Sequence, residues 1–264
     1  MDLGLQGRVA IVTGGSEGIG YATAAALLGE GVAVSICARR PDKLAQAAEE
    51  LRARMGGRLE AISADVSSPE EIGPFVRETE RRLGPVDILI NNAASFQVGG
   101  TSELRDEDWL YHLNVKLLAY VRFVRLVSPG MRSRGWGRII NVGGAAARQV
   151  TGAGGTAGPV NAAIMNYTKN IATEMAPDGV IVNLIHPGAT RTHRHEINVN
   201  RRIEREGISF DQAERETVKG IPTGRMIEPA DCADLIVFLA SDRAASIAGQ
   251  AISVDGGAAR GVFY

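Results

Sequence analysis

The chain has 264 residues, of which 45% are hydrophobic, and its 29 basic and 30 acidic side chains leave a formal net charge of −1. A chain of this length can bury a large core, so a single domain over residues 1–264 is expected. The near-neutral charge gives no long-range attraction to nucleic acid or to an anionic membrane, and a small-molecule substrate is the expected partner.

Cysteine usage and the apolar runs bear on the compartment. Cys37 and Cys232 lie far apart, inside an apparent strand and an apparent helix, so neither a disulfide framework nor a metal site is predicted. Residues 1–6 carry no apolar core of signal-peptide length, and no run approaches the roughly 18 apolar residues of a membrane span. We therefore expect a cytoplasmic location without membrane attachment.

The first patterned stretch, residues 7–30, pairs a short apolar run with a glycine-rich turn and a small-residue helical pattern. The run at residues 9–12 predicts a strand that is buried on both faces. Gly14, Gly18 and Gly20 follow it and precede the helix. Glycines let a backbone approach a phosphate closely, and the start of a helix directs amides at an anion, so this turn predicts a dinucleotide site.

The segment TGGSEGIG at residues 13–20 resembles the nucleotide loop of the short-chain dehydrogenase/reductase family. The resemblance extends over nearly the whole chain, to a last strand within residues 248–257. It implies a doubly wound, Rossmann-type α/β three-layer sandwich whose seven-stranded parallel sheet has the order 3-2-1-4-5-6-7. It also implies a substrate lid at about residues 190–225, while residues 95–104 are expected to form one wall of the substrate pocket.

The exit of the second strand, residues 32–37, bears on the choice of cofactor. An NAD site usually places an acid here for the ribose 2′-hydroxyl, whereas this chain has Arg39 and Arg40. Two guanidinium groups suit a 2′-phosphate, so NADP(H) is favoured over NAD(H). Two solvated arginines at a helix start are the alternative, and Glu17 weakens the preference because family members that use NADP often have a basic residue there.

The resemblance also assigns the remaining contacts with the cofactor. Asp65 and Val66 stand where the family contacts adenine, with a purely local turn as the alternative, and NNAA at residues 91–94 resembles the family's NNAG motif. The full predicted set is Gly14, Ser16, Glu17, Gly18, Ile19, Gly20, Arg39, Arg40, Asp65, Val66, Asn92, Ala93, Ala94, Asn161, Pro187, Gly188, Thr190 and Thr192.

The catalytic positions depart from the family pattern. Asn114 matches the asparagine of the family's catalytic tetrad, where it kinks a helix and supports a proton path. Gly144, Ala157 and Asn161 occupy the places of the serine, tyrosine and lysine. None of the five tyrosines has a lysine four residues further on, so these three groups are absent rather than shifted.

Loss of a positioned general acid costs typically 10² to 10⁴ in rate, which makes ordinary carbonyl reduction by the usual route doubtful. His186, His193 and His195 are candidate replacement acids, and solvated or pocket-rim histidines are the alternative. Arg148, Arg191 and Arg194 are candidate ligands for an anionic substrate, with surface charge as the alternative. Tyr111 is a candidate pocket residue, with packing as the alternative.

The stretch from residue 106 to residue 127 predicts a helix that is apolar nearly all round. Such a helix needs cover on two sides, and one cover is the sheet. We expect a second subunit to supply the other, because members of this family commonly form oligomers. A homotetramer or homodimer is expected, and a hetero-oligomer with a complete family member is the alternative.

Three functions from different classes follow from these patterns. The first is an atypical NADP(H)-dependent oxidoreductase whose small carbonyl, iminium or conjugated substrate needs little help with protonation. The second is a non-redox enzyme, a lyase or isomerase, in the same pocket. The third is a catalytically silent, nucleotide-binding partner subunit of a complete family member.

Overall fold

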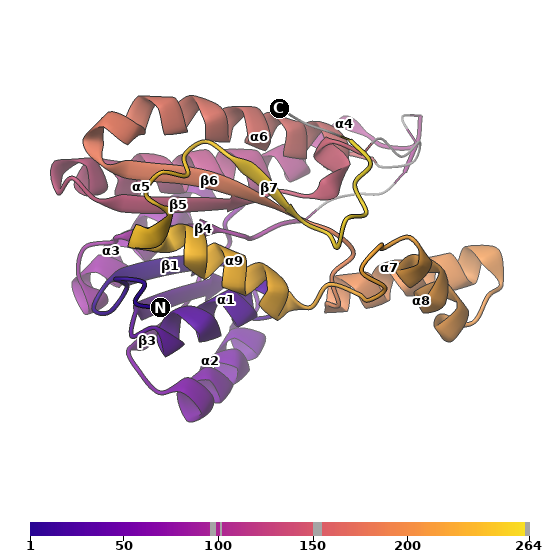
Figure 1. Ribbon diagram of the computed structural model, residues 1–264, viewed down its shortest axis with the longest axis horizontal. Helices are drawn as coiled ribbons and strands as arrows, with labels where there is room; N and C mark the ends of the chain where they lie inside the picture. The colour runs from indigo at the N-terminus through magenta and orange to yellow at the C-terminus, as the bar shows by residue number, and fades with distance from the viewer. Residues whose placement is uncertain (96–98, 101, 150–154, 262–264) are drawn as a thin grey trace.

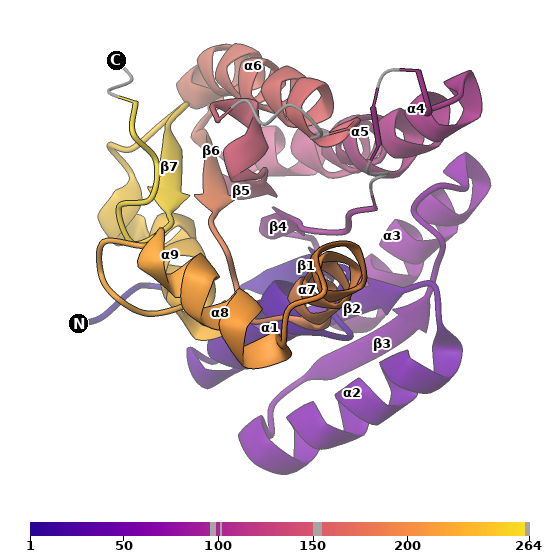
Figure 2. The same cartoon turned by 90° about the vertical axis from the view of Figure 1, so that its right-hand side faces the viewer.

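The computed structural model describes residues 1–95, 99–100, 102–149 and 155–261, and Figures 1 and 2 show a central sheet between two layers of helices. Seven parallel strands form this sheet in the order β3-β2-β1-β4-β5-β6-β7, which confirms the predicted fold. The strands are β1 (Val9–Thr13), β2 (Ala33–Ala38), β3 (Leu59–Ser63), β4 (Ile88–Asn91), β5 (Gly137–Val142), β6 (Val180–Pro187) and β7 (Ala251–Val254).

Each face of the sheet has its own apolar core. Along β1, Ala10 and Val12 belong to one cluster of buried side chains and Ile11 to the other, because successive residues of a strand point to opposite faces. One face is covered by α1 (Gly18–Gly29), α2 (Pro41–Met55) and α9 (Pro229–Ala240), and the other by α3 (Pro69–Leu83), α5 (Ala119–Ser133) and α6 (Ala157–Met175). Among the described residues, no helix is both long and apolar enough to span a bilayer.

The helix predicted over 106–127 is present but longer, and it is interrupted. It consists of α4 (Asp106–His112), a π-helical turn η1 (Leu113–Leu118) and then α5. A π-turn adds a residue to the helical repeat, which changes the direction of the side chains that follow, and such turns are frequent at functional sites. Val115 and Lys116 of η1 are both buried. Leu118 and Leu126, in contrast, remain about two-fifths exposed at 42% and 43%.

The charged segment after β6, which shows no steady apolar period, forms two helices, α7 (His193–Glu206) and α8 (Phe210–Lys219). Capping side chains mark where these helices begin. The Thr192 hydroxyl accepts a bond from the His195 amide, and the Ser209 hydroxyl accepts one from the Gln212 amide. Figure 1 shows α7 and α8 projecting from the body, away from the helices that cover the sheet.

Candidate functional site

A cavity of about 770 Å³ opens at the carboxyl ends of the strands, which is where ligands bind in open parallel sheets. Its lining contains Gly14, Ser16, Glu17, Gly18, Ile19, Arg39, Arg40, Asp65, Val66, Asn92, Ala93, Ala94, Asn161, Pro187, Gly188, Thr190 and Thr192, which is the predicted cofactor set except Gly20. Ser95 also lines the cavity, whereas residues 96–98 and 101 of the predicted wall lie outside the described residues.

The turn between β1 and α1 is built for the close approach of a ligand. Gly14 and Gly18 have φ values of +66° and +58°, a conformation that favours glycine. A Cβ at Gly20 would collide with the Gly14 carbonyl oxygen and would lie 2.5 Å from Asn92 Nδ2. Within the described residues, the Glu17 side chain makes no capping bond to the first turn of α1, so its amides remain for an anion. The turn therefore fits a dinucleotide diphosphate.

The two arginines after β2 each have a partner across the cavity rim. Arg40 Nη2 lies 3.0 Å from Glu17 Oε2, and both side chains are about half exposed. Arg39 Nη1 donates to the Tyr111 hydroxyl at 3.0 Å, so Tyr111 has a polar contact in addition to the expected packing. An exposed ion pair contributes at most about 1 kcal/mol, so a phosphate dianion can replace Glu17 as the partner of Arg40.

Asparagines hold the floor of the cavity together. Asn92 Nδ2 donates to the carbonyl oxygens of Thr13 and Gly14 at 2.9 and 3.2 Å, which ties the end of β4 to β1. Asn91 Nδ2 donates to Asn141 Oδ1 at 2.9 Å and so ties β4 to β5. One Asp65 oxygen accepts bonds from the Ser67 amide and hydroxyl, so this residue both holds its local turn and lines the cavity.

Gly144, Ala157 and Asn161 line another part of the same cavity. Gly144 directly precedes the short 3₁₀ helix η2 (Ala145–Ala147), and the other two belong to α6. A Cβ at Gly144 would lie only 2.9 Å from Asn161 Nδ2. The Asn161 amide thus fills the space that a side chain at position 144 needs. The residue types at positions 144 and 161 are therefore coupled by packing.

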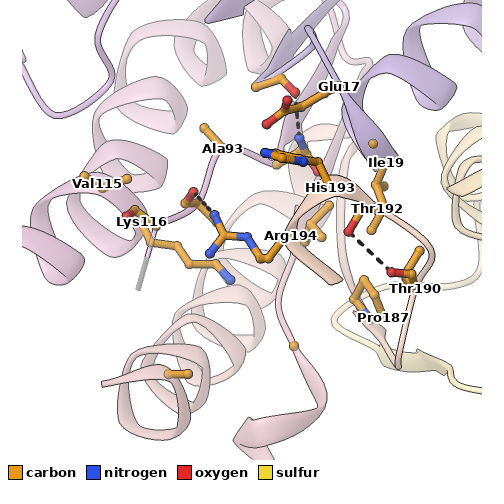
Figure 3. Close-up of a pocket in the computed structure, with 18 of the residues that line it drawn as sticks. Glu17, Ile19, Ala93, Val115, Lys116, Pro187, Thr190, Thr192, His193 and Arg194 are labelled. Carbon is orange, nitrogen blue, oxygen red and sulfur yellow. Dashed lines mark hydrogen bonds between the residues drawn. The ribbon is translucent and has the colours of Figure 1, made fainter. Parts of the chain in front are cut away.

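Lys116 is the functional candidate that sequence reasoning did not identify. Its side chain is buried, and Nζ donates to Asn161 Oδ1 at 2.7 Å and to the Gly143 carbonyl oxygen at 3.1 Å. Burial lowers the pKa of Lys116 to about 7, and the nearby Arg194 guanidinium adds to this shift. Figure 3 shows Lys116 and Arg194 reaching toward one another from opposite walls of the cavity. The apolar pattern of the sequence does not predict that the lysine of the Asn-Val-Lys triplet is buried. The π-turn directs this side chain inward, and the sequence carries no pattern that predicts a π-turn here.

Two buried histidines flank this group and do not fit the role of an acid. His186 Nδ1 accepts a bond from the Gly144 amide at 3.1 Å, and burial, with Arg148 and Lys116, lowers the pKa of His186 to about 4. His112 Nδ1 lies 2.6 Å from the Thr156 hydroxyl, and burial likewise lowers the pKa of His112 to about 4. Both rings are neutral near pH 7, so neither has a proton of useful acidity.

The histidines and arginines near the start of α7 have partners in the same region. His193 and His195 contact Glu196 and Glu214 at 3.2 and 3.1 Å, respectively. Arg191, two residues before α7, forms ion pairs with Glu214 of α8 and with Glu228, which caps the start of α9. Its charge is therefore directed to these segments rather than to the cavity. Arg194 Nη2 donates to the Ala94 carbonyl oxygen at 3.0 Å, and this residue lines the cavity.

Asn114 anchors the π-turn. Its Nδ2 donates to the Ser67 carbonyl oxygen at 2.5 Å, and its Oδ1 accepts a bond from Arg122 Nη1 at 2.6 Å. These contacts direct its side chain toward the β3–α3 connection, whereas its neighbours Val115 and Lys116 line the cavity. Asn114 can therefore affect the chemistry of the site only indirectly, by holding the π-turn that positions Val115 and Lys116.

Comparison with known proteins places the chain among oxidoreductases. The family model described as enoyl-(acyl carrier protein) reductase matches residues 14–259. D-beta-hydroxybutyrate dehydrogenase from Cupriavidus necator is 34% identical over 254 residues, covering 96% of this chain and 98% of that protein. L-sorbose reductase from Gluconobacter frateurii, solved with NADPH and L-sorbose, is 33% identical and has a TM-score of 0.94, with coverage of 99% and 100%.

A second solved structure also matches the chain over nearly its full length. It is a short chain oxidoreductase from Pseudomonas aeruginosa PAO1 described as containing an atypical catalytic center. It is 36% identical to this chain, with a TM-score of 0.90, and the match covers 99% of this chain and 100% of that one.

Proposed function

Because the chain belongs to the short-chain dehydrogenase/reductase family, we propose that it is an atypical NADP(H)-dependent oxidoreductase acting on a small carbonyl, iminium or conjugated substrate. One observation carries this proposal: a single cavity joins the glycine turn and the two arginines to the places where the family carries out its chemistry. The NADPH complex of L-sorbose reductase supports both the cofactor and the carbonyl class.

The residues of the cavity suggest how NADP(H) is held. The turn around Gly14 and Gly18 receives the diphosphate, and Arg39 and Arg40 receive the 2′-phosphate. Asn161 keeps its Nδ2 for a ribose hydroxyl, since its Oδ1 already accepts from Lys116. When bound, the cofactor supplies a hydride. Pro187, Gly188, Thr190 and Thr192 hold the nicotinamide end, and the segment at about 190–225 acts as the lid.

The term atypical refers to the proposed absence of the catalytic serine, tyrosine and lysine at positions 144, 157 and 161, with Asn114 retained. The contact between the Asn161 amide and the space beside Gly144 supports this proposal, because it makes the altered positions a packed, self-consistent group. The atypical catalytic center of the Pseudomonas aeruginosa relative supports it as well.

We also propose that the protein assembles as a homotetramer or homodimer through α4 and α5. The exposed leucines Leu110, Leu118 and Leu126 support an interface along these helices, since large apolar side chains gain from burial. The same surface suits a complete family member, which is the silent-subunit alternative. Co-purification of such a relative favours that alternative, and an active homo-oligomer excludes it.

The decisive experiment is titration of the purified protein with NADPH and NADH by calorimetry, followed by mixing with a panel of ketones, cyclic iminium ions and conjugated ketones. We expect tighter binding of NADPH and loss of reduced-nicotinamide absorbance with at least one acceptor. The double variant Arg39→Ser with Arg40→Ser is expected to weaken NADPH binding and leave NADH binding nearly unchanged. Absence of affinity for either nucleotide would refute the proposal, and substrate conversion without change in the cofactor would favour a lyase or isomerase.

A further inference from the structure

The amine of Lys116 lies where the chain has lost its usual acid. Its Nζ contacts the side chain at 161, and its second acceptor, the Gly143 carbonyl oxygen, directly precedes position 144. Both of those positions belong to the altered catalytic group. Lys116 and Ala157 line the same cavity. A proton donor absent from α6 is thus replaced by one that enters from the facing π-turn of η1.

The contacts of Nζ leave one proton for a ligand. An ammonium group has three N–H donors, and two of them are held by Asn161 Oδ1 and the Gly143 carbonyl oxygen. These two acceptors hold the amine in one position, and Figure 3 shows it directed into the cavity rather than along the wall. Among the described residues the third N–H has no acceptor, so it is available to an oxygen of a bound substrate.

The charged and titratable groups around Nζ favour an amine that gains and loses its proton near neutral pH. Arg194 of α7 and His112 of α4 line the same cavity. On β6, the pKa of His186 is lowered by burial and also by the charge of Lys116. Burial and Arg194 oppose the ammonium form and bring the pKa of Lys116 to about 7. A general acid works best when its pKa is close to the working pH, which the two histidines do not satisfy.

We propose that Lys116 is the catalytic acid of this site and that the substrate is therefore an aldehyde or ketone, whose reduced oxygen must receive a proton. This inference rests on the proposed function. Bound NADPH supplies the hydride and is oxidised to NADP⁺. The carbonyl π bond breaks, a C–H bond forms at the carbonyl carbon, and Lys116 Nζ–H gives its proton to the oxygen. The neutral amine of Lys116 then takes a proton from solvent.

A comparison of two substrate classes tests this role. Reduction of a ketone requires a proton, whereas hydride addition to a permanently charged iminium ion gives a neutral amine without one. The probes are ethyl 3-oxobutanoate and 1-methyl-1-pyrrolinium, each with saturating NADPH. In Lys116→Met, the ratio of ketone to iminium reduction rates should fall by about 10² to 10⁴. Lys169→Met, at an exposed lysine of α6, is the matched control and should keep the wild-type ratio.

The pH dependence gives a second readout. Wild-type ketone reduction should decline above a midpoint near pH 7 as Lys116 loses its proton, and the residual rate of Lys116→Met should lack that midpoint. Lys116→Gln keeps a hydrogen bond to Asn161 and tests whether loss of contact, rather than loss of the acid, is responsible. An unchanged rate ratio or an unchanged pH profile in Lys116→Met overturns the proposal.

A third readout does not depend on turnover. The chain has four lysines, so ¹³C-lysine labelling gives a small set of Cε resonances, and Lys116→Met identifies the one of interest. We expect that resonance to titrate near pH 7 in the nucleotide-free protein. A midpoint near 10 for Lys116 overturns the inference even if NADPH is oxidised. If Lys116 titrates near pH 7 but the protein does not bind NADPH, the proposed function is overturned and the inference about the Lys116 pKa is not.

Discussion

Placing a lysine at position 161 is expected to create a charge conflict with Lys116. In the structure, Asn161 Oδ1 lies 2.7 Å from Lys116 Nζ, so the ammonium of an Asn161→Lys variant would face another ammonium. Two unit charges about 4 Å apart repel by about 4 kcal/mol at an effective dielectric constant near 20. The protein escapes this repulsion by releasing one proton, which makes the cost depend on pH.

The size of the effect follows from linkage. Lys116 has a pKa of about 7 in the folded protein, below its value of 10.5 in the unfolded chain, so it is largely neutral above pH 7 and the added lysine meets no charge there. Below pH 7 the variant must keep Lys116 deprotonated, at about 1.4 kcal/mol for each pH unit. At each pH we compare the free energy of unfolding of the variant with that of wild type. Relative to the difference at pH 9, the variant should be less stable by about 1.4 kcal/mol at pH 6 and by about 2.7 kcal/mol at pH 5.

Denaturant unfolding at pH 5, 6 and 9 measures this difference. The double variant Asn161→Lys with Lys116→Met is the control, because it keeps the new lysine but removes its opponent. Its stability difference from Lys116→Met should be the same at all three pH values. A pH-independent cost for the single variant, or the same pH dependence in the double variant, would refute the electrostatic reasoning.

Three further variants test other parts of the structure. Gly20→Ala should lower the free energy of unfolding by about 1 to 3 kcal/mol and abolish NADPH binding, because its Cβ meets the neighbouring backbone; thermal melting and calorimetry measure both effects. Glu17→Gln frees Arg40 and should tighten NADPH binding up to about fivefold while leaving NADH binding unchanged, as measured by competitive fluorescence titration. Leu118→Glu with Leu126→Glu should shift the protein to a smaller species in light scattering if these residues lie in a subunit interface, and an unchanged mass would exclude that interface.

The sheet and the glycine turn are the parts that the sequence predicts well. Buried parallel strands leave continuous apolar runs, and a strand, three glycines and a helix leave a local pattern that needs no distant contact to be recognised. Arg39 and Arg40 could be placed at the rim for the same reason, since they follow a strand whose end is known. The ion pair between Arg40 and Glu17 joins residues 23 positions apart, and its formation could not be predicted from the sequence.

Helices α7 and α8 show a different limit. Their segment has no regular apolar face, so periodicity gave no helix, whereas the caps at Thr192 and Ser209 and the left-handed Gly207 define both helices in the structure. In the structure, these local hydrogen bonds act together with the burial of Val199 and Ala213. The capping residues can be recognised in the sequence, but a cap predicts a helix only when apolar residues at helical spacing follow it.

The sequence by itself determined the glycine turn and the residue types at positions 144, 157 and 161, and their fixed spacing predicts that the catalytic serine, tyrosine and lysine are absent. Only the tertiary structure decided which side chains surround these three positions. Lys116 reaches Asn161 across 45 positions of chain, through a π-turn that no apolar period reveals and into an enclosure that lowers its pKa. Burial and the direction of a side chain arise from packing between distant segments, so the sequence alone could not predict that Lys116 lies in the site.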